Sequence, residues 1–219
     1  MIHFIDVEKY FDTTIGTQVI LRSANMTIPT NLRVGILGRN GAGKSTLLRM
    51  IAGVEKPSRG RLIRKGKISW PLGLVGGLHP ELTGLENIQF LVRLYEADIK
   101  WVVDYVQEFA ELGSFLEMPV RHYSSGMRAK LMFGLSLAID FDCYLIDELV
   151  GVGDRFFREK SQKAFADRAL RSGLLLVSHN EKTVKEYCEY TLVLYKGYLI
   201  PFDNIDEGIE YYLQSGEAG

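Results

Sequence analysis

The sequence predicts an α/β fold with a mostly parallel central sheet flanked by helices. Short apolar runs near Arg33, Tyr144 and Leu174 lack polar alternation, as expected for strands that are buried on both faces. Helical patterns separate these runs along the chain. Buried strands alternating with helices are typical of a parallel sheet covered on both sides.

The expected elements follow from local patterns along the chain. Strand-like segments occur at residues 2–7, 19–21, 33–37, 67–70, 144–147, 174–178 and 192–195, and helices are expected at 45–52, 86–116, 127–139 and 207–213. The segment 86–116 contains no proline and repeats apolar residues at helical spacing, which predicts a helical insert. Pro57 and Gly60, then Pro71 and Gly73, indicate turns and β-structure before it.

Composition limits both the size of the fold and the class of partner. The 219 residues are 47% hydrophobic, enough for one substantial core. The formal net charge of −1 offers no general attraction to nucleic acid, so no nucleic-acid partner is expected. The two cysteines, Cys143 and Cys188, lack metal-ligand spacing and are expected to be reduced thiols. Neither a signal peptide nor an apolar run of about eighteen residues is visible, so we expect a cytosolic chain that forms no membrane pore itself.

The clearest motif is a phosphate-binding loop at residues 38–45, between a predicted strand and a predicted helix. Its glycines allow a tight turn that points backbone N–H groups at phosphate oxygens, while Lys44 supplies a positive charge and Ser45 a Mg²⁺ ligand. A glycine-rich turn that only caps a helix would explain the glycines but not the Lys-Ser pair. The expected nucleotide contacts are Gly38, Asn40, Gly41, Ala42, Gly43, Lys44, Ser45 and Thr46.

Two acidic residues lie at the end of the apolar strand 144–147. Asp147, the last residue of that strand, is expected to hold Mg²⁺ through water, and Glu148 is the candidate general base that orients the attacking water. Two acids at a strand end could instead cap the next helix. The phosphate loop upstream favours the catalytic interpretation.

A third motif, Tyr123-Ser124-Ser125-Gly126-Met127, opens the helix 127–139. It resembles the signature sequence of the ABC ATPases, in which small residues at a helix start bind the γ-phosphate of a nucleotide held by another copy. By itself it could be a simple serine N-cap. Two further residues match the family's order: His179 resembles the switch histidine at the γ-phosphate, and Asp154 resembles the aspartate beyond the catalytic acid. Tyr10, or Phe11, lies where family members stack an aromatic ring on adenine, although an amphipathic strand residue could equally be core.

The resemblance covers essentially the whole chain and implies a P-loop NTPase of the ABC ATPase type. It implies a mostly parallel core and a small antiparallel β lobe at about 1–85 and 140–219, and a helical insert at about 86–139, within one domain of 1–219. It also implies ATP and Mg²⁺ as cofactors and a permease that spans the membrane. Because each motif occurs once, two copies would pair head to tail around two ATP molecules.

The sequence departs from most ABC ATPases in two places. The segment 70–84 contains no glutamine where the family usually has one facing the membrane partner, and residues 149–154 read Leu-Val-Gly-Val-Gly-Asp. These departures, with the His79-Pro80-Glu81-Leu82-Thr83-Gly84 loop, resemble the ATPases that export capsular polysaccharide across the bacterial inner membrane. The resemblance implies a peripheral position on the cytoplasmic face of that membrane and further capsule-export components as partners. The glycine-rich segment 73–84 is our candidate coupling surface.

Other functions remain possible from the sequence. O-antigen and teichoic acid exporters resemble this branch closely, and a lipid or drug exporter would share every catalytic motif. A non-transport ABC ATPase acting on ribosomes or DNA would need tandem ATPase domains, a coiled-coil insertion or a basic face, and the sequence shows none of these.

Overall fold

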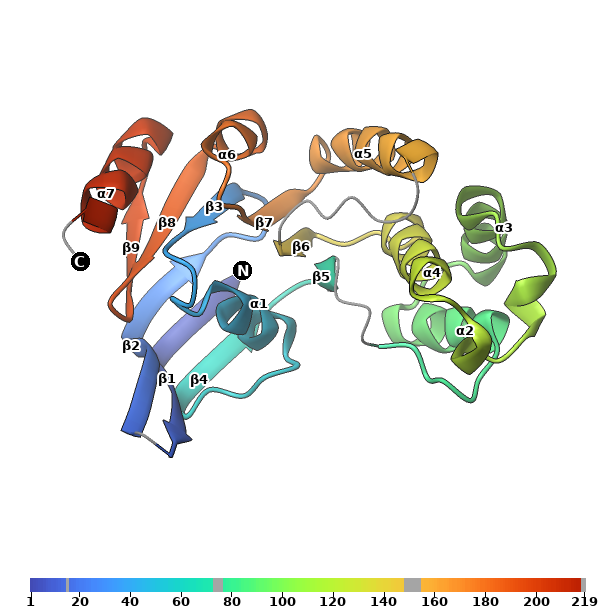
Figure 1. Ribbon diagram of the computed structural model, residues 1–219, viewed down its shortest axis with the longest axis horizontal. Coiled ribbons are helices and arrows are strands. Elements are labelled where there is room, and N and C mark those ends of the chain that lie inside the picture. Colours follow the sequence, from blue (N-terminus) through green and yellow to red (C-terminus); the bar gives the residue numbers. More distant parts are fainter. Residues whose placement is uncertain (15, 73–76, 148–154, 218–219) are drawn as a thin grey trace. The chain divides into compact units, whose positions relative to one another are not determined.

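The computed structural model describes residues 1–14, 16–72, 77–147 and 155–217 (Figure 1). The chain divides into two compact units. The first unit consists of Met1–Pro71, Asp142–Leu149 and Ser172–Gly219, and the second of Leu72–Phe141 and Val150–Arg171. The predicted α/β fold with a mostly parallel sheet is confirmed, whereas the organisation as a single domain stays a prediction.

A six-stranded sheet forms the centre of the first unit. Its strands, in spatial order, are β5 (Ile68–Leu72), β6 (Cys143–Asp147), β7 (Gly173–Val177), β3 (Arg33–Leu37), β8 (Tyr190–Tyr195) and β9 (Tyr198–Phe202). Strands β6, β7, β3 and β8 pair in parallel, and β9 is antiparallel to β8. Figure 1 shows α1 (Lys44–Ala52) on one face of this sheet and α6 (Glu181–Tyr187) on the other, while α7 (Ile205–Glu217) packs beside β8.

Proline occupies both edge strands of this sheet. Pro71 lies inside β5, where the sequence had suggested a turn, and Pro201 lies inside β9. Proline cannot donate a hydrogen bond to a neighbouring strand, so it is tolerated where one side of a strand has no partner. The edge position of β5 therefore explains why Pro71 extends a strand instead of ending it.

A second sheet in the first unit is antiparallel and has the order β2 (Gly16–Ile28), β1 (Ile2–Thr13), β4 (Arg59–Arg64). The strands predicted at 2–7 and 19–21 are found as β1 and β2, and both extend beyond the predicted residues. Strand β4 was not predicted as a separate element, because five of its six residues are exposed and its sequence, RGRLIR, lacks the alternation of a half-buried strand.

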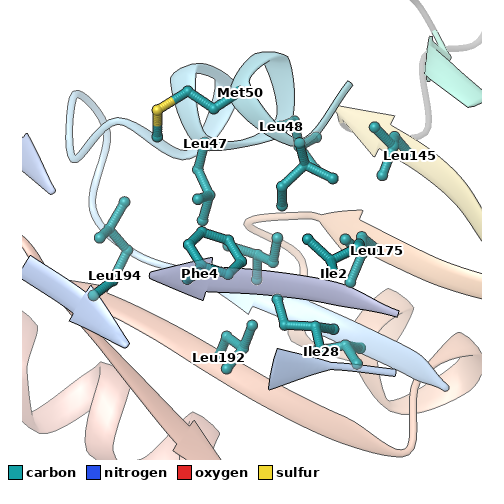
Figure 2. Packing of buried hydrophobic residues seen from close by; sticks show 14 of the residues in the cluster. Ile2, Phe4, Ile28, Leu47, Leu48, Met50, Leu145, Leu175, Leu192 and Leu194 are labelled. Atoms are coloured by element: carbon teal, nitrogen blue, oxygen red, sulfur yellow. The ribbon is translucent and has the colours of Figure 1, made fainter. Parts of the chain in front are cut away.

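The helix that follows the phosphate loop is anchored in the core of this unit. Figure 2 shows Leu47 and Leu48 of α1 pointing toward the strands that carry Phe4, Leu145 and Leu175. All five side chains are almost completely buried. Burial of a leucine or phenylalanine contributes roughly 1.5–3 kcal/mol, so this packing fixes α1 firmly against the strands around it.

The C-terminal end of α1 is held by an arginine from the second sheet. Arg64 of β4 donates from Nε to the Ile51 carbonyl (2.6 Å) and from Nη2 to the Met50 carbonyl. These carbonyls lie in the last turn of the helix, where the macrodipole favours a cation. Burial lowers the pKa of the guanidinium, and arginine side chains stay protonated in proteins.

Replacing Arg64 by methionine is expected to lower the free energy of unfolding by about 1.5–3 kcal/mol, the range for hydrogen bonds to a charged group. Arg61→Met is the matched control, because Arg61 is exposed on the same strand. Urea denaturation followed by circular dichroism would measure both variants. An equal loss in the two would contradict the role given to the Arg64 hydrogen bonds.

The second unit contains α2 (Gly84–Tyr95), α3 (Ile99–Ala110), α4 (Ser125–Ala138) and α5 (Arg155–Ala169), with short 3-10 helices at Gly113–Glu117 and Val120–His122. The predicted helical insert 86–116 therefore consists of two α-helices and a 3-10 helix. Glu96 ends α2 with φ 52°, and Asp98 caps α3 by accepting from the Trp101 N–H (2.8 Å). In the described part of the chain, no helix is long and apolar enough to cross a membrane.

Candidate functional site

The parallel strands of the first unit place three predicted groups at one edge of the sheet. Ile36 of β3 pairs with Val177 of β7, and Val177 pairs with Asp147 of β6. The phosphate loop follows β3 directly, and His179 follows β7 by two residues. Carboxyl ends of parallel strands share an edge, where open α/β sheets bind their ligands. The phosphate loop, Asp147 and His179 thus lie at the same edge of the sheet.

The phosphate loop is wound tightly around its lysine. Lys44 is only 9% exposed, and its Nζ donates to the carbonyls of Gly38 (2.6 Å) and Arg39 (3.0 Å). Gly41 and Gly43 have φ angles of 80° and 103°. Gly43 is also the N-cap of α1, and it has no side chain to occupy the first N–H groups of the helix. Those N–H groups and the ammonium form a cradle suited to an anion.

The two glycines give a testable contrast. A Cβ on Gly43 would lie 2.3 Å from Cγ2 of Ile20, whereas a Cβ on Gly41 would meet no atom within 4 Å. Gly41→Ala should therefore cost only the backbone strain of a positive φ, about 1–2 kcal/mol. Gly43→Ala adds the displacement of a buried side chain and should cost about 3 kcal/mol or more in unfolding free energy. Denaturant titrations of the two variants would measure the difference, and equal losses would contradict the packing of Ile20 against the loop.

The oxygen donors near the loop fit a magnesium ion. Ser45 lies in the first turn of α1, and Asp147 ends β6 at the same edge of the sheet. A hydroxyl and a carboxylate are hard oxygen ligands of the kind that Mg²⁺ accepts together with phosphate and water. Thr46, the next loop contact expected from sequence, is buried in the helix, and its hydroxyl accepts from Arg49 (3.0 Å). Glu148 and Asp154 lie outside the described residues.

The turn that carries His179 is held on both sides. The Asn180 N–H donates to Oγ of Ser178 (3.0 Å), and Oδ1 of Asn180 accepts from the Lys182 N–H, which caps α6. The ring of His179 is exposed at the sheet edge. Sequence reasoning missed Asn180, although an asparagine just before Glu181 is a recognisable helix start.

Both aromatic candidates for adenine stacking lie near the end of β1 and are half-buried. The backbone of Tyr10 is tied to Ser58: the Tyr10 N–H donates to Oγ of Ser58, which donates to the Tyr10 carbonyl (both 3.1 Å). Phe11 instead lies beneath a cation, with Nζ of Lys9 4.4 Å from its ring centroid. Lys9, which the sequence did not single out, is 6% exposed and pairs with Glu55 (2.5 Å). Tyr10 stays the predicted adenine-stacking residue, with Phe11 as the alternative.

The signature, residues 123–127, lies in the second unit. Ser124 is the N-cap of α4 and accepts from the Met127 N–H (3.2 Å), and Ser125 and Gly126 form the first turn of the helix. Ser124 and Ser125 are exposed. A cavity of about 730 Å³ lies beside this turn and is lined by residues 111–115, 124–127 and Lys130. An exposed helix start with small side chains is suited to receive an anion from a ligand bound elsewhere.

Comparisons with known proteins place this arrangement in a family. Residues 21–151 match the family model described as ABC transporter. The chain belongs to the ABC transporter family. KpsT of Escherichia coli, a polysialic acid transport ATP-binding protein, is 44% identical over 215 residues, which are 97% of this chain and 96% of KpsT. The O-antigen export system ATP-binding protein RfbB of Klebsiella pneumoniae is 37% identical over 199 residues, 89% of this chain and 81% of RfbB.

Structural similarity agrees with this membership. The dimeric ATP-binding cassette MJ0796, solved in a post-hydrolysis state with ADP and Pi, superposes on this ABC ATPase with a TM-score of 0.70 at 22% sequence identity. The aligned region is 91% of this chain and 96% of the MJ0796 chain. The family, the fold and the class of enzyme, a nucleotide-binding transport ATPase, are thereby confirmed. The part of the glutamine-free segment that the structure describes is Trp70–Leu72 and residues 77–84; Gly73 to Gly76 lie outside it.

Proposed function

We propose that this protein is the ATP-hydrolysing subunit of an inner-membrane exporter that moves capsular polysaccharide through a separate permease. The observation that supports capsular polysaccharide as the cargo is the 44% identity to KpsT over nearly the full length of both chains. Export of an O-antigen-type glycan by the same motor is the second candidate, and the lower identity and coverage of RfbB make it the weaker one.

The chemistry follows from the edge of the central sheet. Lys44 and the N-terminal N–H groups of α1 bind the β- and γ-phosphates, and Ser45 and Asp147 are the residues to hold Mg²⁺. The ion supplies charge neutralisation for phosphoryl transfer when it is bound. Glu148 accepts a proton from the attacking water, and His179 orients the γ-phosphate from the end of β7.

A second copy of the chain completes each site. Because the phosphate loop and the signature occur once each, one copy supplies the loop and the other supplies Ser124, Ser125 and Gly126 to the γ-phosphate. Asp154, in the loop beyond the catalytic acid, contributes to nucleotide binding. Closing and reopening of this head-to-tail dimer would drive the permease, with the protein peripheral on the cytoplasmic face of the inner membrane and further capsule-export components nearby.

Co-purification tests the assignment. A tagged Glu148→Gln protein, held closed with ATP, is extracted gently from native membranes, and its partners are identified by mass spectrometry. A polytopic permease with capsule-export components supports the proposal. An O-antigen, lipid or drug permease would keep the transporter function but change the assigned cargo. Ribosomes or DNA-bound proteins without a permease would overturn the transporter function.

A further inference from the structure

Asn87 in the first turn of α2 is a buried side chain whose polar atoms are all used within the second unit. It is 2% exposed. Its Nδ2 donates to the carbonyls of Thr83 (2.8 Å), His79 (3.1 Å) and Leu82 (3.3 Å), and its Oδ1 accepts from the His79 N–H (2.7 Å). An amide donates and accepts at once, as this position requires, whereas a carboxylate only accepts. Asn87 therefore fixes the loop 79–84 over the start of α2.

The same loop is bonded to the segment that leads into the signature. Three backbone hydrogen bonds join them: Arg121 N to Pro80 O (2.8 Å), Val120 N to Leu82 O (2.9 Å) and Gly84 N to Met118 O (3.3 Å). The side chains of Arg121 and Glu81 form an ion pair between the two segments. Residues 118–121 therefore follow any displacement of the loop.

Tyr123 connects these two segments to the helix start. Its ring is 3% exposed, and its hydroxyl donates to the Phe115 carbonyl (2.5 Å). The hydroxyl also stands against Gly84, where an added Cβ would lie 2.3 Å from it. The next residue, Ser124, is the N-cap of α4. Closely packed side chains transmit small displacements, since interiors have few voids to absorb them.

We propose that Asn87 is a positioning residue for the signature: through the loop 79–84 it sets the place of Ser124 and the first turn of α4, and hence how well one copy completes the nucleotide site of the other. This role rests on the proposed function of the signature. A shift of about 1 Å in a group that must meet a phosphate can cost about a hundredfold in rate. In this ATPase, whose segment 70–84 contains no glutamine, the loop gives a route from the candidate coupling segment to the partner's ATP.

Asn87→Asp is the first test, since it keeps the shape of the side chain but removes the donor. ATP binding to a single copy should be unchanged, because the phosphate loop belongs to the other unit. The kcat for hydrolysis should fall about tenfold or more, and ATP-dependent dimerisation in a Glu148→Gln background should weaken, as expected when buried acceptors lose their donor. Asn31→Asp is the matched control, because Asn31 is exposed in a turn of the first unit.

Gly84→Ala provides a second test that does not alter the amide. The added methyl group meets the Tyr123 hydroxyl, so kcat should fall with single-copy ATP binding intact. Adding Tyr123→Phe removes the nearest obstruction and should bring kcat back toward the level of Tyr123→Phe alone, although Cδ2 and Cα of Leu116 still lie 3.1 and 3.3 Å from the added methyl group. Gly84→Ala with and without Tyr123→Phe tests the positioning role if Asn87→Asp does not fold.

The two proposals fail in different ways. If the unaltered protein showed no ATP-dependent dimerisation, the proposed function of the signature would be wrong. If it dimerised and hydrolysed ATP normally while the Asn87 and Gly84 variants kept full kcat, or lost kcat and single-copy binding together, the positioning role would be overturned.

Discussion

The Glu148→Gln protein is expected to hydrolyse ATP about a hundred to ten thousand times more slowly than the unaltered chain, the range typical of removing a general base. Glutamine keeps the size of the side chain but cannot accept a proton from water at neutral pH. ATP affinity should stay within about twofold, because in the proposed site the phosphates are bound by groups of the phosphate loop and not by this carboxyl group. Single-turnover hydrolysis and nucleotide titration would measure the two effects separately.

The closed dimer should accumulate in this variant, since hydrolysis is the step that reopens it. Light scattering with ATP would show a mass of two copies, and ADP should not replace ATP. Glu108→Gln, an exposed glutamate on α3, is the control for the same chemical change. Full hydrolysis by Glu148→Gln would mean that another group activates the water.

The phosphate loop and the central strands were predictable because their signals are local. A strand buried on both faces reads as a continuous apolar run, and the predicted 33–37 is found unchanged as β3. The glycines, Lys44 and Ser45 act through the backbone geometry of contiguous residues. The shared edge that brings Asp147 and His179 to the loop then follows from parallel pairing.

The parts that escaped prediction depend on contacts between segments. Strand β4 is mostly exposed, so its sequence has no apolar pattern that would predict a strand. Its pairing with β1 and the hydrogen bonds of Arg64 to α1 are visible only in the structure. Asn87 looks like an ordinary polar residue in a helix until the path of the loop 79–84 is known. The proposed meeting of the phosphate loop with the signature needs a second copy, and no pattern within one chain fixes its geometry.

Lys44→Met is the other change with a large expected effect. Methionine fills the space of the lysine stem but removes the charge that we propose faces the β- and γ-phosphates. A hydrogen bond to a charged group contributes about 1.5–3 kcal/mol, so ATP affinity should fall roughly tenfold to a hundredfold. Hydrolysis should fall further, because charge on the transferred group grows in the transition state and stabilisation of that charge is the main contribution of such sites.

The fold itself should tolerate this change. In the structure Nζ of Lys44 bonds to carbonyls of its own loop, so the variant loses local hydrogen bonds while Leu47 and Leu48 keep α1 in the core. Calorimetric ATP titration, steady-state hydrolysis and thermal unfolding would separate the effects, with Lys65→Met, at an exposed position, as the control. Unchanged ATP affinity in Lys44→Met would place the phosphates away from this loop and would remove the basis for the proposed site.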